Sequence, residues 1–218
     1  MLAVSRPFNP EVPMRLFLAP ALLVLTATPA VAGAVDQMVT AYRLFDLGVA
    51  AQDGLSQIAA ARLAAGIEVH PVERAPEAEG GRDGGKDQRP APRDPAAMME
   101  LARVAVEADE TLALLLQDAA ATAELLPKAT LRQSAAVLRP GEVHRYQLAV
   151  DGGAETAIGV IGDGDSPLNL TIGTETGPLC QQDGSALACA LQLPESGFVT
   201  VTLRNTGDGV NGYWLLTE

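Results

Sequence analysis

The spacing of the apolar positions changes near the middle of this chain. Between Ala34 and Leu126 these positions recur every three to four residues, as on one face of an α-helix. The first such face carries Met38, Tyr42, Phe45 and Val49. A second helical stretch follows Asp53, whose side chain can cap a helix N-terminus, and Gly66 is suited to end it. The pattern therefore predicts a helical hairpin.

Helical spacing returns further along the chain. Asp94-Pro95 combines an N-capping residue with proline at the first helical position. Apolar residues then continue at helical spacing toward Leu126, and Asp109 stands where a further helix can begin. We therefore predict a second hairpin, so that residues 34–127 form a helical region.

This helical region is interrupted by residues 69–93, which differ in composition. The segment contains four prolines, two Gly-Gly pairs and charges of both signs, but few aliphatic side chains. Such a segment cannot bury enough apolar surface to offset the entropy lost when it becomes ordered. We therefore predict a disordered loop at residues 69–93.

From residue 128 to the C-terminus, apolar and polar residues alternate instead. The alternation is clear in residues 144–150, 156–160 and 199–203, and Gly, Pro, Asp and Asn mark turns between such segments. Several short alternating segments at this spacing indicate an antiparallel β-sandwich. The predicted fold class is α+β, with helical hairpins followed by a β-sandwich domain at residues 128–218.

The N-terminal 32 residues have the organisation of a secretory signal peptide. A charged Met14-Arg15 precedes an apolar run from Leu16 to Leu25, and Ala30-Val31-Ala32 fits a cleavage site. The apolar run is shorter than the roughly 20 residues that span a bilayer. We therefore predict translation from Met14, export to the periplasm or the medium, and no membrane attachment after cleavage.

Composition narrows the classes of partner. The formal net charge is −12, and no stretch of the sequence gathers lysines and arginines. Nucleic-acid binding needs clustered basic side chains to displace counterions from phosphates, and an anionic membrane surface repels an acidic protein. The predicted partner is therefore another envelope or secreted protein, while the oligomeric state does not follow from the sequence.

The two cysteines of the chain, Cys180 and Cys189, are nine positions apart. In an oxidising compartment such a pair is expected to form a disulfide. A type II′ turn at Gly184-Ser185 would place them opposite each other in a β-hairpin. The competing type I′ turn at Asp183-Gly184 would instead place Leu187 opposite Cys180.

Four segments of the C-terminal half resemble the bacterial pre-peptidase C-terminal domain, a jelly-roll-like β-sandwich of secreted proteins. They are, in this order, LRPGEVHRYQLAV, GDGDSPLNLTI, LPESGFVTVTL and NGYWLLTE. The resemblance covers residues 131–218. It implies an accessory role, often beside secreted peptidases.

A calcium site is the best chemical candidate in the sequence. Asp163, Asp165 and Asn169 place oxygen atoms within one loop, and Asp208 and Asn211 do so in another. Ca²⁺ is bound by about 6–8 oxygen ligands, which these side chains supply in part. The alternative is that these residues serve as ordinary turn formers, as Asp-Gly and Asn-Gly pairs commonly do.

The sequence offers little for catalysis. Its two histidines are His70, at the start of the predicted loop, and His144, in a predicted strand. It contains no G-x-S-x-G elbow, no H-E-x-x-H motif and no glycine-rich phosphate loop. We therefore expect His144 to be a core or strand-end residue and the protein not to be an enzyme.

These patterns together predict an exported, non-catalytic binding or accessory protein of the bacterial envelope. In this interpretation the β-sandwich mediates interaction with a protein or a ligand, and no cofactor other than Ca²⁺ is expected. The alternative is a calcium- or glycan-binding sandwich whose site lies in the loops of Asp163 and Asp208.

Overall fold

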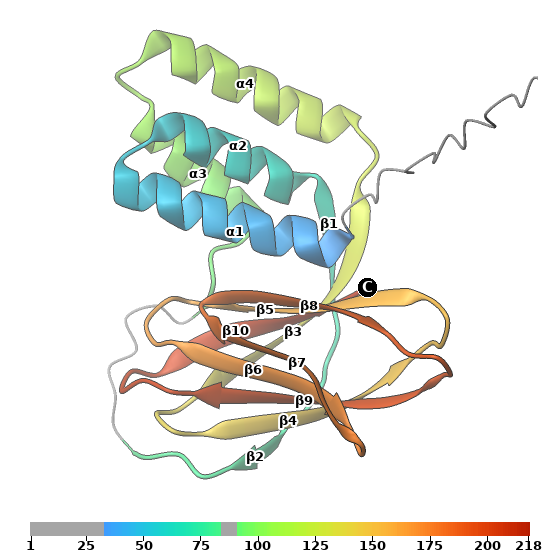
Figure 1. The fold of residues 1–218 in the computed structure, drawn as a ribbon. Coiled ribbons are helices and arrows are strands. Elements are labelled where there is room, and N and C mark those ends of the chain that lie inside the picture. The colour runs from blue at the N-terminus through green and yellow to red at the C-terminus, as the bar shows by residue number, and fades with distance from the viewer. Residues whose placement is uncertain (1–32, 84–90) are drawn as a thin grey trace, which may run out of the picture. The chain divides into compact units, whose positions relative to one another are not determined.

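The computed structural model describes residues 33–83 and 91–218, and in it four helices cover one face of a two-sheet sandwich (Figure 1). The predicted α+β fold class is therefore confirmed. The predicted signal peptide at residues 1–32 lies outside the described residues. The described residues belong to one compact unit that contains both the helices and the sandwich.

The helices begin where the sequence places capping residues. They are α1 (Ala34–Ala51), α2 (Gly54–Ala65), α3 (Pro95–Ala105) and α4 (Glu110–Leu125). Side chains of Asp53, Asp94 and Asp109 accept hydrogen bonds from the first free backbone N–H groups of α2, α3 and α4, at 2.6–3.1 Å. The first predicted hairpin is present as α1 and α2, whereas α3 and α4, which follow each other in the chain as predicted, pack mainly against α2.

Eight strands form the sandwich proper. They are β3 (Ala129–Leu138), β4 (Val143–Val150), β5 (Glu155–Gly162), β6 (Leu168–Thr174), β7 (Gly177–Gly184), β8 (Ala186–Gln192), β9 (Gly197–Asn205) and β10 (Asn211–Thr217). One sheet has the order β3-β10-β5-β8 and the other β4-β9-β6-β7, all antiparallel. This order is that of a jelly roll, as expected from the sequence.

The prediction of disorder at residues 69–93 is wrong for its N-terminal part. There β1 (Ile67–Pro71) pairs in parallel with β3, and β2 (Glu77–Glu79) pairs antiparallel with β4. Each strand adds an edge to one sheet, so the chain between them crosses from one sheet to the other (Figure 1). Residues 84–90 of the predicted loop lie outside the described residues.

Hydrogen bonds order this crossing segment, rather than buried apolar surface. The Arg74 guanidinium donates to the hydroxyl groups of Ser134, at 3.1 Å, and Thr217, at 3.0 Å. The backbone N–H of Val72 donates to Gln133 O at 2.7 Å. Composition alone does not reveal such bonds, because their partners lie on strands far away in the sequence.

Two apolar cores lie on opposite faces of the sheet that contains β10. Between the sheets, side chains such as Val160, Leu170, Leu203 and Leu215 are fully buried. On the other face, Trp214 and Leu216 pack with the helices in a second core. All seven residues of β10 are buried for this reason, and the strand has no polar face.

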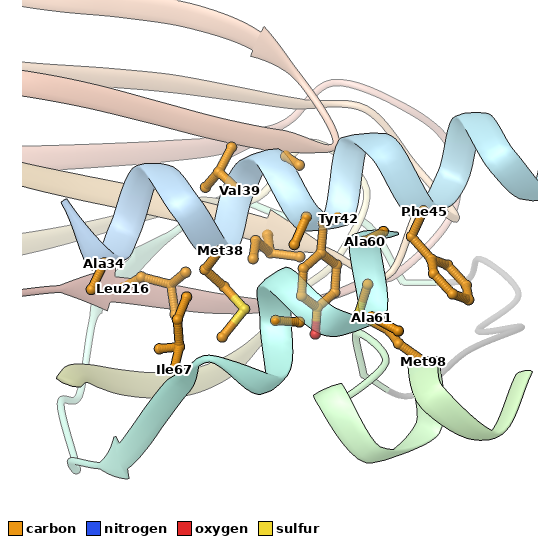
Figure 2. Close-up of a cluster of buried hydrophobic side chains, with 14 of the residues drawn as sticks. Ala34, Met38, Val39, Tyr42, Phe45, Ala60, Ala61, Ile67, Met98 and Leu216 are labelled. Atoms are coloured by element: carbon orange, nitrogen blue, oxygen red, sulfur yellow. The ribbon is translucent and has the colours of Figure 1, made fainter. Parts of the chain in front are cut away.

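Helix α1 forms the contact between the helical layer and this sheet. Figure 2 shows side chains of α1 directed both toward the strands and toward α2 and α3. The rings of Tyr42 and Trp214 meet edge to face with centroids 6.0 Å apart. At Gly159 a Cβ atom would lie 2.6 Å from Val35 Cγ1 and 3.2 Å from Val39 Cγ2. The close approach of α1 to β5 therefore depends on the missing side chain of Gly159.

Candidate functional site

An apolar groove lies in the helical layer between α3 and α4. Both helices pack mainly against α2 and touch each other only little, which leaves a groove of about 560 Å³ between them. Its apolar lining consists of Ala96, Met99, Val106, Ala113, Leu116 and Ala120. Small alanines on both walls would let a partner backbone approach closely.

The groove lining follows from helical spacing on both walls. On α4, Ala113, Gln117 and Ala120 stand at i, i+4 and i+7, so they face the same side. On α3, the opposite side of the helix carries Met98 and Ala102, which are buried against the rest of the helical layer. Two lining residues, Val106 and Leu116, are themselves buried in the helical core, whereas Ala96, Met99, Ala113 and Ala120 are at least partly exposed.

Polar side chains form the rim of the groove. They are Glu100, Arg103, Glu107 and Gln117. Arg103 Nε donates to Glu100 Oε2 at 2.9 Å, and this hydrogen bond lowers the pKa of Glu100. Because both side chains are largely exposed, the pair adds little to stability and is free to rearrange when a partner binds.

Several large apolar side chains are exposed on the helical layer. On α4, Leu114 is 66% exposed and Leu125 is 84% exposed. The remaining large apolar side chains exposed on the helical layer are Leu47, Val49, Leu55, Leu101, Val104, Leu115 and Leu126. Single exposed leucines are common. Of these residues, Leu101, Val104, Leu114, Leu115 and Leu125 lie on the two helices that form the groove.

The sequence-predicted disulfide between Cys180 and Cys189 is present, with the Cα atoms 6.2 Å apart. Its predicted setting in a β-hairpin is wrong, because β7 and β8 belong to different sheets. At the end of β7, Gly184 has a φ of 145°, which favours glycine, and the chain crosses there to the other sheet. The disulfide therefore links the two sheets along one side of the sandwich.

The loops predicted to bind calcium do meet at one end of the sandwich. Asp163 is buried, and its carboxylate accepts hydrogen bonds from the backbone N–H groups of Asp165, at 2.8 Å, and Gly212. Ser166 Oγ donates to Asn205 Oδ1 at 2.7 Å, and Asn211 donates to the backbone of Ser166. Protein hydrogen bonds thus join these loops.

The other predicted ligands point elsewhere. Asn169 donates to Asp183 at 2.9 Å, and the exposed Asp208 pairs with Arg82 at 3.0 Å. Within residues 33–83 and 91–218 no three His, Cys, Asp or Glu side chains gather closely enough to hold a metal ion. Calcium binding by Asp163, Asp165 and Asn169 stays a prediction, which calorimetry with and without a chelator tests.

Sequence reasoning missed a chain of buried polar groups inside the sandwich. His144 Nδ1 lies 2.7 Å from Tyr213 Oη, which lies 2.6 Å from Tyr146 Oη. Glu142 Oε1 is 3.7 Å from the other imidazole nitrogen, Nε2. His144 and Tyr146 extend from β4, whereas Tyr213 belongs to β10, so the chain connects the two sheets.

Burial shapes the acid–base properties of these groups. It lowers the pKa of His144, although the carboxylate of Glu142 acts in the opposite direction. It also raises the pKa values of the Tyr146 and Tyr213 hydroxyls. His144 is only 5% exposed, so a substrate has no access to its imidazole. The expectation of a core histidine agrees with this position.

Two further features of the sequence concern His70 and the apolar character of the helices. His70 lies exposed on β1, with Nε2 3.8 Å from Glu68 Oε1. No helix in the part of the chain that the structure describes combines the length and the apolar character needed to cross a membrane.

No protein-family model matches the chain, and no curated protein matches it. Three solved structures are similar to its C-terminal part. A de novo designed double-stranded β-helix is 16% identical, with a TM-score of 0.28, over 40% of this chain and 99% of that chain. PliG, a periplasmic inhibitor of g-type lysozyme from Aeromonas hydrophila, is 16% identical, with a TM-score of 0.33, over 40% of this chain and 84% of that chain. The mitogen derived from Yersinia pseudotuberculosis is 11% identical, with a TM-score of 0.23, over 35% of this chain and 85% of that chain.

These similarities carry no argument about function, because every TM-score is below 0.5. The sandwich fold of the C-terminal part follows from its own strand order. Membership of the pre-peptidase C-terminal family stays a prediction, since no family model matches.

Proposed function

We propose that this chain is an exported, non-catalytic binding protein, and that another protein of the bacterial envelope binds in the groove between α3 and α4. The groove carries the proposal, together with the exposed apolar side chains of the two helices that form it. An apolar surface of this kind is costly to expose to water, and a bound partner would cover it. The proposed binding surface lies on the helical layer, whereas the sequence pointed to the sandwich.

The disulfide supports export. Cys180 and Cys189 are joined in a bond that persists in oxidising compartments, and this agrees with the predicted signal peptide. In this proposal the sandwich provides the rigid base for the helices, since α1 packs on one of its sheets. An accessory role of this type is what the resemblance to the pre-peptidase C-terminal domain implies.

The absence of catalysis in this proposal is supported by the position of His144. A general base must reach a proton of the substrate, and the imidazole is enclosed between the two sheets and hydrogen-bonded to Tyr213. The sequence also lacks the common motifs of nucleophilic and metal-assisted catalysis.

The test compares two neighbouring positions on α4. Ala120 lines the groove, whereas Ala121 is exposed and does not. We expect Ala120→Trp to fill the groove and abolish capture of envelope proteins by the mature chain, and Ala121→Trp to leave capture unchanged. Circular dichroism checks that both variants fold. Equal capture by Ala120→Trp and the wild type would show that the groove is not the binding site.

A further inference from the structure

The charge of the two helices that form the groove indicates the chemistry of its occupant, and the rim itself carries Glu100, Glu107 and Arg103. Residues 94–125, which contain α3 and α4, carry seven carboxylate side chains and one guanidinium group, for a formal charge of −6. They are Asp94, Glu100, Glu107, Asp109, Glu110, Asp118, Glu124 and Arg103. An apolar groove within an acidic surface is complementary to an apolar stripe flanked by basic side chains.

The shape of the groove favours a helix as the occupant. Its walls are two helices, and packed helices lie about 8–10 Å apart when their side chains interdigitate. Ala113 and Ala120 repeat at i and i+7 on one wall, and Ala96 faces the groove from the other. These small side chains leave room for the side-chain ridge of a third helix.

A second copy of this chain does not have the required chemistry. Each described helix carries at most one basic residue, namely Arg43 on α1, Arg62 on α2 and Arg103 on α3. On the sandwich, Arg82, Arg139 and Arg145 are paired with Asp208, Asp83 and Glu79. Two copies with a net charge of −12 would also repel each other.

We propose that the groove between α3 and α4 binds an amphipathic helix of the partner protein, with its apolar stripe on the accessible lining residues Met99, Ala113 and Ala120 and with lysines or arginines on its flanks facing the carboxylates. This inference rests on the proposed function and names the class of its occupant. The attraction steers association and falls as salt screens it, while the apolar stripe determines the register of the bound helix.

The test uses three synthetic peptides of 16 residues, the length of α4. One has a leucine and alanine stripe with lysine flanks, its twin has the same stripe with glutamate flanks, and the third is a scrambled lysine peptide without a stripe. In fluorescence anisotropy with the mature chain we expect the lysine peptide to bind about tenfold or more tightly than the glutamate twin at low salt. The ratio should shrink toward one as the salt concentration rises.

The second part of the experiment reverses the charge at the rim of the groove. We expect Glu100→Lys with Glu107→Lys to reverse the preference between the twin peptides. The control, Glu175→Lys with Glu195→Lys, changes the net charge equally at exposed turns of the sandwich and should preserve the preference. Should the reversed double variant fail to fold, Glu107→Gln alone should still reduce the ratio.

The outcomes separate this inference from the proposed function. Equal affinity of the two stripe peptides, or equal binding of the scrambled peptide, overturns the basic helix as occupant. If the two stripe peptides bind the wild type equally and Ala120→Trp abolishes the binding of both, the groove remains a protein-binding site and only the charge argument is wrong. A dimer of the wild type that Ala120→Trp dissociates would make a second copy the occupant and overturn this inference.

Discussion

Tyr213 occupies the centre of the buried polar chain, so its replacement by Phe should destabilise the fold more than the same replacement at Tyr146. The Tyr213 hydroxyl meets two partners, His144 Nδ1 at 2.7 Å and Tyr146 Oη at 2.6 Å. Phe keeps the ring and adds no cavity. In Tyr213→Phe, however, two buried polar groups lose their partner at once.

The expected magnitude follows from that count. Each buried polar group left without a partner costs about 1–3 kcal/mol, so Tyr213→Phe, which leaves two, should lose about 2–6 kcal/mol of unfolding free energy. In Tyr146→Phe the Tyr213 hydroxyl keeps its bond to His144, and the loss should be near the net value of one hydrogen bond, about 1 kcal/mol. The double variant leaves His144 as the unpaired member, so its loss should be smaller than the sum of the two single losses.

Urea unfolding followed by circular dichroism measures these differences when the unfolding free energy of all variants depends equally steeply on the urea concentration. The single tryptophan, Trp214, lies against α1 and reports by fluorescence whether the helical layer stays docked. Equal losses in the two single variants, or no loss in Tyr213→Phe, would refute the reasoning that Tyr213 connects both neighbours.

Three further outcomes are expected. Burial lowers the pKa of His144 in the folded state, so below about pH 6.5 the unfolded chain binds more protons than the folded chain. The free energy of unfolding should therefore fall as the pH falls through this window. Urea titrations at several pH values should show a weaker dependence of the unfolding free energy on pH in His144→Phe. Gly159→Val should lower the free energy of unfolding by about 1–3 kcal/mol, because the added side chain pushes α1 off the sheet, and it should shift the tryptophan emission to the red. The control, Gly197→Val, has open space around its Cα and should change neither the unfolding free energy nor the emission. Joint replacement of Cys180 and Cys189 by Ser should lower the unfolding free energy by about 2.6 kcal/mol for a closed loop of nine residues, and reducing the wild-type disulfide should give the same loss.

The sequence by itself determined the features that depend on near neighbours along the chain. The helix starts at Asp53, Asp94 and Asp109 are local, because each carboxylate caps N–H groups two or three residues away. The alternation that predicted the sandwich is also local, since successive side chains of a strand point to opposite faces. The pairing of Cys180 with Cys189 followed from there being two cysteines in an exported chain.

Only the tertiary structure decided which distant segments meet. The composition of residues 69–79 predicts disorder, yet β1 and β2 find hydrogen-bond partners at the edges of the two sheets. These partners, on β3 and β4, lie more than 60 residues further along the chain. The groove between α3 and α4 likewise depends on how both helices pack on α2. The chain from His144 through Tyr213 to Tyr146 spans both sheets, and its partners are separated by 67 and 69 residues. Such contacts depend on the arrangement of whole layers, which no spacing within a single segment encodes.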